Sequence, residues 1–392
     1  MALYFHRFSF TGITANLIIV PLLEAVIPIG FLAVFTVWRV PASIAGWLLH
    51  WAARTADWHV RWEPAWRVSN PPFWMAAAFA AALILFAMAL RFERSRVAAG
   101  GAVAALFGIL LWQPWPPRVS PLTLELTAID VGQGDSLLVV FPDGRRMVVD
   151  GGGVLQFGPA TRHRSNLDTG EDVVSPYLWS RGIQTIDVLV ATHAHEDHSG
   201  GLLAILENFR PREVWVGANP PASLLEGAAN RKIPVVARHS EAPFEYGGTR
   251  LEILSPPEDY VSAKPGNNDS LAFRIVYGAN SFLLTGDLEA PMERRLLADG
   301  RLAQSDVLKV GHHGSKTSTT PDFLAAVSPS FAIISAGFDN SFGHPHRDVV
   351  GRLAEEHAAI LRTDHDGLVT VRSDGSFPLS ARRNRRRTFR YL

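Results

Sequence analysis

The chain has 392 residues, of which 47% are hydrophobic and 19% are charged, and it contains no cysteine. This composition excludes a disordered or fibrous protein, and its positive mean hydropathy of +0.10 is unusual for an ordinary soluble enzyme. Without cysteine there are no disulfides and no thiolate ligands, so histidine nitrogens and carboxylate oxygens must hold any metal ion.

Positive and negative charges are equal over the whole chain but not along it. Residues 1–118 carry 9 arginines and 4 acidic side chains, and residues 119–380 carry 22 basic and 33 acidic side chains. Residues 381–392 carry 6 arginines and no acid. Because an acidic middle part would repel a polyanionic substrate, its charge indicates bound cations.

Three apolar runs near the N-terminus predict transmembrane helices, at residues 15–38, 73–90 and 97–112. The first run is long enough to cross about 30 Å of hydrocarbon at about 1.5 Å per residue, with a kink at Pro21 or Pro28. The third run is short and rich in Gly and Ala, so it would cross only a thin or deformed bilayer.

Tryptophans are concentrated between the first two apolar runs. Most of them recur every three or four residues, which places indoles on one helical face: Trp47, Trp51, Trp58, Trp62 and Trp66. Tryptophan favours the membrane interface, so we expect this segment to lie along the membrane surface. An aromatic stripe inside a protein core is the alternative.

Arginines in the short loop between the second and third runs, Arg91, Arg94 and Arg96, favour a cytoplasmic loop. The third helix would then place the rest of the chain outside the cytoplasm, although arginines in the preceding loop oppose this orientation. Four prolines in residues 112–121 predict a stiff, extended connection. We therefore expect membrane helices in 1–113, a linker in 114–121, a globular domain in 122–380 and an arginine-rich tail in 381–392.

From residue 122 onward, short β-rich strings alternate with helical patterns. The strings predict strands at 122–130, 136–141, 146–150, 186–192, 213–216, 251–254, 271–277, 281–285, 307–310 and 332–335. The patterns predict helices at 173–181, 201–209, 291–299, 321–326 and 347–357. Strands with interspersed helices predict layered α/β packing.

The strongest chemical signal is THAHEDHSGG at residues 192–201, directly after a strongly apolar predicted strand. Its HxHxDH spacing would let one turn aim His193 and His195 at one metal ion, and Asp197 and His198 at a second. Imidazole and carboxylate groups suit zinc, manganese or iron. A turn that only capped a helix would need one Asp or Ser and not three histidines.

This motif resembles the signature of the metallo-β-lactamase fold, an α/β fold in which an αββα sandwich holds metals at one edge. The resemblance implies that Asp150 supports the metal loop, that Asp287 bridges two metals and that His312 completes the second metal. The family's third histidine on the first metal is not evident. His239 is the only histidine between residues 201 and 287, and GNNDSL at 266–271 occupies the corresponding place. The resemblance therefore implies a site for one or two divalent ions, either zinc or manganese.

Further motifs resemble the carboxyl-terminal part of the ComEC competence family. They are FSFTGITANLIIVPL, DVGQGDS, NNDSLAFRI, LLTGD, VLKVGHHGSKTS and SFGHPH. Members of that family are polytopic DNA-uptake channels of the bacterial inner membrane. The resemblance implies a multi-pass protein that meets DNA, other uptake subunits or further copies of itself. Full-length members have more membrane spans, so we expect this chain to be a truncated or split form.

A metal-bound water would attack a phosphodiester, with Asp197 or Asp287 accepting its proton. His313, His344 and His346 are candidate acids for the leaving group, and His313 and His344 are taken as catalytic. Candidate substrate-binding residues are Asn268, Asp135, Ser315 and Lys316. Asp135 in GQGDS could instead reach the metals or cap a turn, and the HHGSKTS string with Ser315 and Lys316 could instead be a solvated loop. The tail interleaves arginines with Phe389 and Tyr391, which suits single-stranded DNA, anionic lipid or a disordered segment.

The leading hypothesis is an inner-membrane DNA-uptake protein whose metal-dependent domain cleaves phosphodiester bonds of incoming DNA. A non-catalytic module that guides DNA is one alternative. A hydrolase of small esters or phosphodiesters is another, since a fold does not decide its substrate.

Overall fold

The computed structural model describes residues 6, 9, 11–62, 67–153 and 167–384. The chain forms two compact units, Met1–Trp115 and Pro116–Leu392, and the division falls inside the segment where we expected a linker. Each unit is described by itself.

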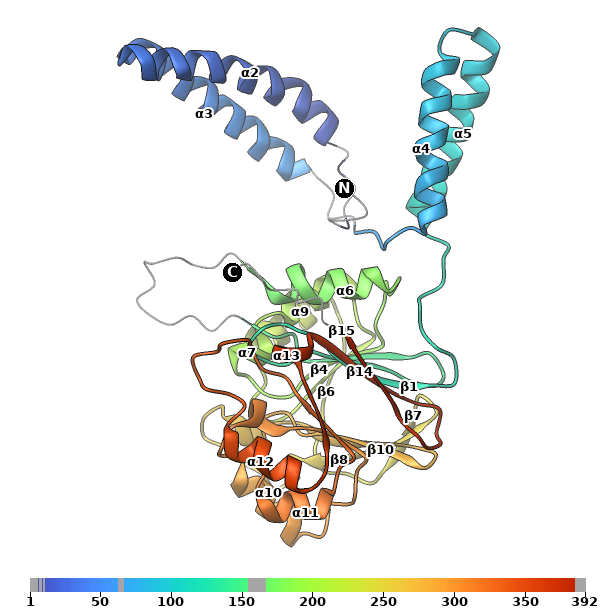
Figure 1. Cartoon of the computed structure of the whole chain (residues 1–392), viewed down its shortest axis with the longest axis vertical. Helices are drawn as coiled ribbons and strands as arrows, with labels where there is room; N and C mark the ends of the chain where they lie inside the picture. Colours follow the sequence, from blue (N-terminus) through green and yellow to red (C-terminus); the bar gives the residue numbers. More distant parts are fainter. Residues whose placement is uncertain (1–5, 7–8, 10, 63–66, 154–166, 385–392) are drawn as a thin grey trace. The chain divides into compact units, whose positions relative to one another are not determined.

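The first unit is helical (Figure 1). Its helices are α2 (Gly12–Thr36), α3 (Arg39–Trp62), α4 (Phe73–Ala89) and α5 (Glu93–Trp112). Helix α2 packs against α3, and α4 packs against α5. The three predicted apolar runs therefore form the helices α2, α4 and α5.

Two segments of this unit, Gly12–Thr36 and Arg94–Trp112, are long and apolar enough to cross a membrane. Helix α4 is equally apolar but has only 17 residues, so the expected count of three spans is not established. Helix α2 runs through both Pro21 and Pro28 as one helix.

Helix α3 carries the tryptophan series. The ring centroids of Trp47 and Trp51 lie 6.2 Å apart and those of Trp58 and Trp62 lie 6.3 Å apart, as side chains on one helical face must. All four side chains are exposed in this unit. Trp66 lies outside the described residues, and the interfacial position of the segment stays a prediction.

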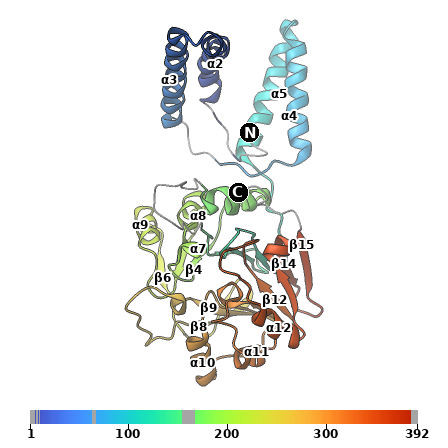
Figure 2. The same cartoon turned by 60° about the vertical axis from the view of Figure 1, so that its left-hand side comes forward.

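The second unit contains two β-sheets that face each other (Figure 2). The first has the strand order β15-β14-β1-β2-β3-β4-β5-β6. Its strands are β1 (Leu124–Ala128), β2 (Leu137–Val140), β3 (Arg146–Val149), β4 (Val188–Ala191), β5 (Glu213–Val216), β6 (Val235–Ala237), β14 (Leu368–Ser373) and β15 (Ser380–Asn384).

The second sheet has the order β13-β12-β11-β10-β9-β8-β7. Its strands are β7 (Phe244–Tyr246), β8 (Thr249–Ser255), β9 (Ala272–Tyr277), β10 (Asn280–Leu284), β11 (Val307–Lys309), β12 (Phe331–Ile334) and β13 (Ala359–Arg362). Strands β3 to β6 run parallel to one another, as do β10 to β13.

Helices cover the outer face of each sheet (Figures 1 and 2). Over the first sheet lie α6 (Ser175–Ser180), α8 (Leu202–Phe209) and α9 (Ala222–Asn230), and over the second lie α10 (Ala290–Ala298), α11 (Pro321–Val327) and α12 (Arg347–Glu355). A fully buried apolar core fills the space between the sheets. The αββα sandwich predicted from the sequence is therefore confirmed.

All ten predicted strands are present, but β6, β7, β13, β14 and β15 were not predicted. Strand β14 could have been found, because Val369 and Val371 alternate with other residues at the period of a strand. Strand β15 could not, because SARRN has no apolar pattern and the strand is exposed at the sheet edge. Arg382 and Arg383 thus belong to the sheet, and residues 385–392 lie outside the described residues.

Candidate metal centre

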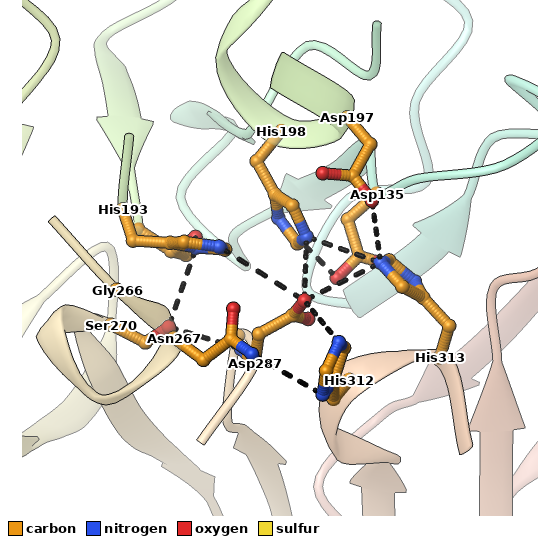
Figure 3. Close-up of polar contacts among 12 residues, drawn as sticks. Asp135, His193, Asp197, His198, Gly266, Asn267, Ser270, Asp287, His312 and His313 are labelled. Atoms are coloured by element: carbon orange, nitrogen blue, oxygen red, sulfur yellow. Dashed lines mark hydrogen bonds and ion pairs between the residues drawn. The ribbon is translucent and has the colours of Figure 1, made fainter. Parts of the chain in front are cut away.

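The candidate ligands sit on loops that follow strands of both sheets. Asp150 follows β3 and the HxHxDH loop follows β4, whereas Asp287 follows β10 and the two histidines of GHHG follow β11. Because the carboxyl ends of these strands meet at one edge of the sandwich, side chains far apart in the sequence come together (Figure 3).

Four side chains converge at the middle of this edge. Nε2 of His198 lies 3.1 Å from Oδ2 of Asp287 and 3.3 Å from Nε2 of His313. The same His313 nitrogen lies 3.3 Å from Oδ2 of Asp197 and 3.5 Å from Oδ2 of Asp287. Two imidazole nitrogens and two carboxylate oxygens thus face one point, which is a donor set for divalent zinc, manganese or iron.

Hydrogen bonds behind these ligands set the direction of the imidazoles. Nδ1 of His198 lies 2.7 Å from Oδ2 of Asp150, and that carboxylate also accepts hydrogen bonds from the backbone N–H and the hydroxyl of Thr192. Nδ1 of His313 lies 3.0 Å from the backbone oxygen of Ser335. With both Nδ1 atoms engaged, both Nε2 atoms are left facing the centre.

Asp135, which we expected to bind substrate, is 1% exposed and lies behind the two histidines. Its ligand oxygen lies within 4.8 Å of ligand atoms of His198, Asp287 and His313. However, its carboxylate faces Nδ1 of His198 at 3.8 Å and Nδ1 of His313 at 3.6 Å, on the side away from the centre. This position suits an outer support better than a direct ligand.

His193 and His195 form a second group beside the first. Their ring centroids lie 4.7 Å apart, and His193 Nε2 lies 4.0 Å from Oδ2 of Asp287. The Nε2 atom of His193 is buried and has no hydrogen-bond partner in the described ranges, although its Nδ1 lies 3.1 Å from the hydroxyl of Thr192. A buried nitrogen of this kind fits a metal ligand.

The segment 266–270 lies against this second group, at the place where a third histidine was expected (Figure 3). The hydroxyl of Ser270 lies 3.4 Å from Nδ1 of His193, and the amide nitrogen of Asn267 lies 3.4 Å from Nδ1 of His312. His239 contacts the backbone oxygen of Ser240, away from the cluster. Oδ1 of Asn267 is buried, and none of the residues that the structure describes donates a hydrogen bond to it.

The two adjacent histidines of GHHG point in different directions. Both have left-handed backbone angles, with φ of 47° at His312 and 54° at His313, and Gly314 follows with φ of 80°. His313 is buried in the centre, whereas the side chain of His312 is 23% exposed and its Nε2 lies 3.9 Å from Asp287. Nδ1 of His312 lies 3.2 Å from a carboxylate oxygen of Glu289. We expected His312 as the ligand and His313 as the acid; in the structure His313 is nearer the centre.

The remaining candidates lie around the rim. The ring of His344 lies 5.5 Å from that of His312 and 5.8 Å from that of Phe342. His346 caps α12 and accepts a hydrogen bond from the backbone of Asp348. Asn268 accepts a hydrogen bond from the backbone N–H of Glu289, and the hydroxyl of Ser315 forms a hydrogen bond with that of Thr317. The side chain of Lys316 is exposed.

Burial and charge pairing shift the protonation of the whole cluster. Burial lowers the pKa of His198, but the carboxylates of Asp287 and Asp150 outweigh it and hold that pKa well above its usual value. Burial also lowers the pKa of His313, but the carboxylates of Asp287 and Asp135 outweigh this effect and raise the pKa to about 9. Burial raises the pKa of Asp287, yet the two histidines bring it well below the usual value.

Two other histidines are shifted in the opposite direction. Burial, and then the neighbouring His198, lower the pKa of His193 well below its usual value. Burial, and then His313 and His312, lower the pKa of His344 to about 4. Both imidazoles are therefore neutral near pH 7, the form that binds a metal or accepts a proton.

The residues present fit a divalent cation. The donor atoms are imidazole nitrogens and carboxylate oxygens, and Nε2 of His193 is a buried nitrogen that has no hydrogen-bond partner among the described residues. A cation placed among the carboxylates would balance their negative charge.

Lys309 was missed by the sequence analysis. It is the last residue of β11, is fully buried, and makes an ion pair with Asp135. The sequence signal for it was a lysine inside the apolar string VLKV at residues 307–310, which predicts that the lysine is buried. Because a buried ammonium needs an acidic partner, this pattern also indicates a carboxylate nearby.

Comparison with known families agrees with this fold. A model of the metallo-beta-lactamase superfamily matches residues 129–337, and a model of the family described as Competence protein matches residues 1–94. The chain therefore belongs to the metallo-beta-lactamase superfamily. More particularly, it joins such a domain to a competence-protein domain, so both resemblances noted in the sequence are confirmed.

Relatives at about 30% identity share both parts. ComE operon protein 3 of Bacillus subtilis (strain 168) is 29% identical over 387 residues, which are 94% of this chain and 49% of that protein. Recombination protein 2 of Haemophilus influenzae is 30% identical over 400 residues, which are 94% of this chain and 47% of that protein. The chain thus spans about half the length of these relatives. The metallo-beta-lactamase fold protein YhfI from Bacillus subtilis is 12% identical, with a TM-score of 0.38 over 61% of this chain and 96% of its own.

Proposed function

We propose that this chain is a multi-pass protein of the bacterial inner membrane that acts in DNA uptake, and that its centre hydrolyses phosphodiester bonds of incoming DNA. The observation that carries the proposal is the meeting of four side chains, His198, His313, Asp197 and Asp287. His198 lies 3.1 Å from Asp287, and Nε2 of His313 lies 3.3 Å from His198, 3.3 Å from Asp197 and 3.5 Å from Asp287. The competence-protein domain supports the role in DNA uptake.

One or two divalent ions, manganese or zinc, would be held by this donor set. One ion would be held by His198, His313, Asp197 and Asp287. The other would be held by His193 and His195, and it is called the second ion from here on. When bound, such ions acidify a neighbouring water and neutralise charge on a phosphate.

The chain's own residues would orient and protonate the reacting groups. Asp150 fixes the His198 ring through its Nδ1. The pKa of Asp197, raised by burial but lowered more by His313 and His198, is below its usual value, so its carboxylate is ionised and can accept a proton. His344 is half-buried at the rim, and its Nδ1 has no hydrogen-bond partner among the residues described. A phosphate there would raise the pKa of His344 and favour proton donation.

Substrate contacts would come from the exposed rim. Lys316 is exposed on the loop after His313 and is available to a phosphate. Single-stranded DNA is the favoured substrate, and we place the hydrolase domain on the extracytoplasmic side, because the arginine-rich loop around residues 91–96 favours the cytoplasm. Other uptake subunits or further copies of the chain are the proposed partners.

Cleavage of labelled single-stranded DNA by the purified full chain in detergent, supplied with Mn²⁺ or Zn²⁺, tests this function. Replacing His193 and Asp197 together by Ala should reduce the rate at least about 100-fold. The matched control is His365→Ala, whose side chain is 59% exposed. Equal cleavage by the double variant and the control would contradict the proposal. Including duplex DNA and small esters in the same assay identifies the substrate class.

The second candidate function is a non-catalytic module that guides DNA. The observation in its favour is that Ser270 adjoins His193, and Asn267 adjoins His312, at the place where a third histidine was expected. DNA affinity that survives complete removal of metal by a chelator, without any cleavage when metal is restored, would support this candidate.

A further inference from the structure

Lys309 lies beneath the metal centre, at the end of β11. Its side chain is 0% exposed, and its ammonium contacts three oxygens. These are Oδ2 of Asp135, the backbone oxygen of Gly286 at 3.3 Å, and Oδ1 of Asp287 at 3.9 Å. The ammonium therefore donates hydrogen bonds to two of these oxygens, Asp135 Oδ2 and the Gly286 backbone oxygen, and lies at ion-pair distance from the third.

Asp287 lies between this ammonium and the histidines. Its Oδ1 faces Lys309, whereas its Oδ2 lies 3.1 Å from Nε2 of His198 and 3.5 Å from Nε2 of His313. Oδ1 is buried and makes no hydrogen bond within the described part of the chain, where the charge of Lys309 is the feature that holds it on that side. Asp287 therefore presents a single oxygen to the centre.

The charge of Lys309 changes how many cations the cluster can accept. Four buried carboxylates surround the centre, and Lys309 offsets one of them: Asp135, Asp150, Asp197 and Asp287. With neutral imidazoles, these four carboxylates and the ammonium carry a net charge of −3, so one divalent ion would leave −1 and two would leave +1. Without the ammonium, two divalent ions would balance the four carboxylates completely. Since uncompensated charge in a buried site is costly, Lys309 makes a second ion less favourable than it would be without the lysine.

We propose that Lys309 is a resident cation of the metal centre, a positioning residue that directs Oδ2 of Asp287 toward the histidines and weakens the binding of a second divalent ion. The ion at His198 and His313 is then held tightly and the ion at His193 and His195 loosely. This inference rests on the metal centre in the proposed function.

Titration of the metal-free full chain in detergent with Mn²⁺, followed by the electron paramagnetic resonance signal of free Mn²⁺, measures both the stoichiometry and the two dissociation constants. Lys309→Met removes the ammonium and should tighten the second ion by about tenfold or more. Asp135→Asn removes a negative charge and should weaken the binding of the second ion. The double variant Lys309→Met with Asp135→Asn keeps the net charge and should resemble the wild type. Lys264→Met, at an exposed position, should change nothing.

A role in folding alone predicts the opposite sign, because Lys309→Met would loosen the ligands and weaken both ions. That result, or equal second-ion affinity in Asp135→Asn and the double variant, would overturn the proposal. Asp135→Asn and the double variant differ only at residue 309, where one has a lysine and the other a methionine. Comparing their second-ion affinities therefore tests the role of the lysine charge even when the single variant Lys309→Met does not fold. Failure of the wild type to bind any Mn²⁺ would instead overturn the metal centre, and the inference with it.

Discussion

Nδ1 of His198 lies 2.7 Å from Oδ2 of Asp150, across 48 residues of sequence and from the neighbouring strand. The same carboxylate accepts two hydrogen bonds from Thr192, at 2.8 and 2.7 Å, so its orientation is fixed from two sides. This relationship keeps the proton of His198 on Nδ1 and leaves Nε2 as a donor to a metal.

Asp150→Asn should therefore weaken metal binding about 10- to 100-fold, because an amide holds the imidazole less firmly in the required direction. Mn²⁺ titration of the full chain measures the effect. Asp374→Asn, at a fully exposed carboxylate, serves as the control and should bind like the wild type. Unchanged affinity in Asp150→Asn would show that the His198 orientation is set by other groups.

The metal-free protein should lose stability as the pH rises from about 6.5 to about 9. The folded state raises the pKa of His313 to about 9 and that of His198 well above its usual value. A raised pKa stabilises the folded state fully below the unfolded value of about 6.5, and this contribution disappears as the pH passes through the folded value.

Thermal unfolding in the presence of a chelator, measured across this pH range, checks the prediction. His313→Asn should show a smaller decrease in Tm than the wild type, and His365→Ala should show the same decrease. A metal-free wild type whose Tm stays constant from pH 6.5 to 9 would contradict the assigned protonation of the cluster.

His344→Ala should lower the rate of DNA cleavage about 100-fold while leaving metal affinity unchanged, because His344 borders the centre without occupying it. His346→Ala is the matched control, since His346 caps α12 and its side chain is 41% exposed. Parallel cleavage assays and Mn²⁺ titrations separate the two effects. Similar rates in the two variants would remove His344 from the mechanism.

Gly314→Ala should destabilise the protein by about 1–3 kcal/mol and disturb His313. The backbone at Gly314 has φ of 80°, and an added Cβ would lie 2.6 Å from Cβ of Pro345. Gly351→Ala, in α12 with no atom within 4 Å of the added Cβ, should be neutral or stabilising by about 0.5–1 kcal/mol. Thermal unfolding of both variants measures the contrast, and equal Tm values would contradict it.

The sequence predicted the parts of the fold and site that are encoded locally. The HxHxDH loop follows an apolar strand, so the meeting of His193, His195 and His198 could be read from spacing. The choice between His312 and His313 could not, because it depends on a left-handed turn in which neighbouring side chains diverge. The position of Asp135 could not be predicted from local spacing either, since its contacts with Lys309 and His313 join residues more than 170 positions apart.

The central claim is that one divalent ion is bound where His198, His313, Asp197 and Asp287 meet. Anomalous diffraction from crystals of the full chain grown with Zn²⁺ or Mn²⁺, recorded at the absorption edge of the metal, tests it most directly. We predict the strongest anomalous peak within bonding distance of Nε2 of His198 and Nε2 of His313. A map with metal peaks only elsewhere in the molecule, or with none, would contradict the account.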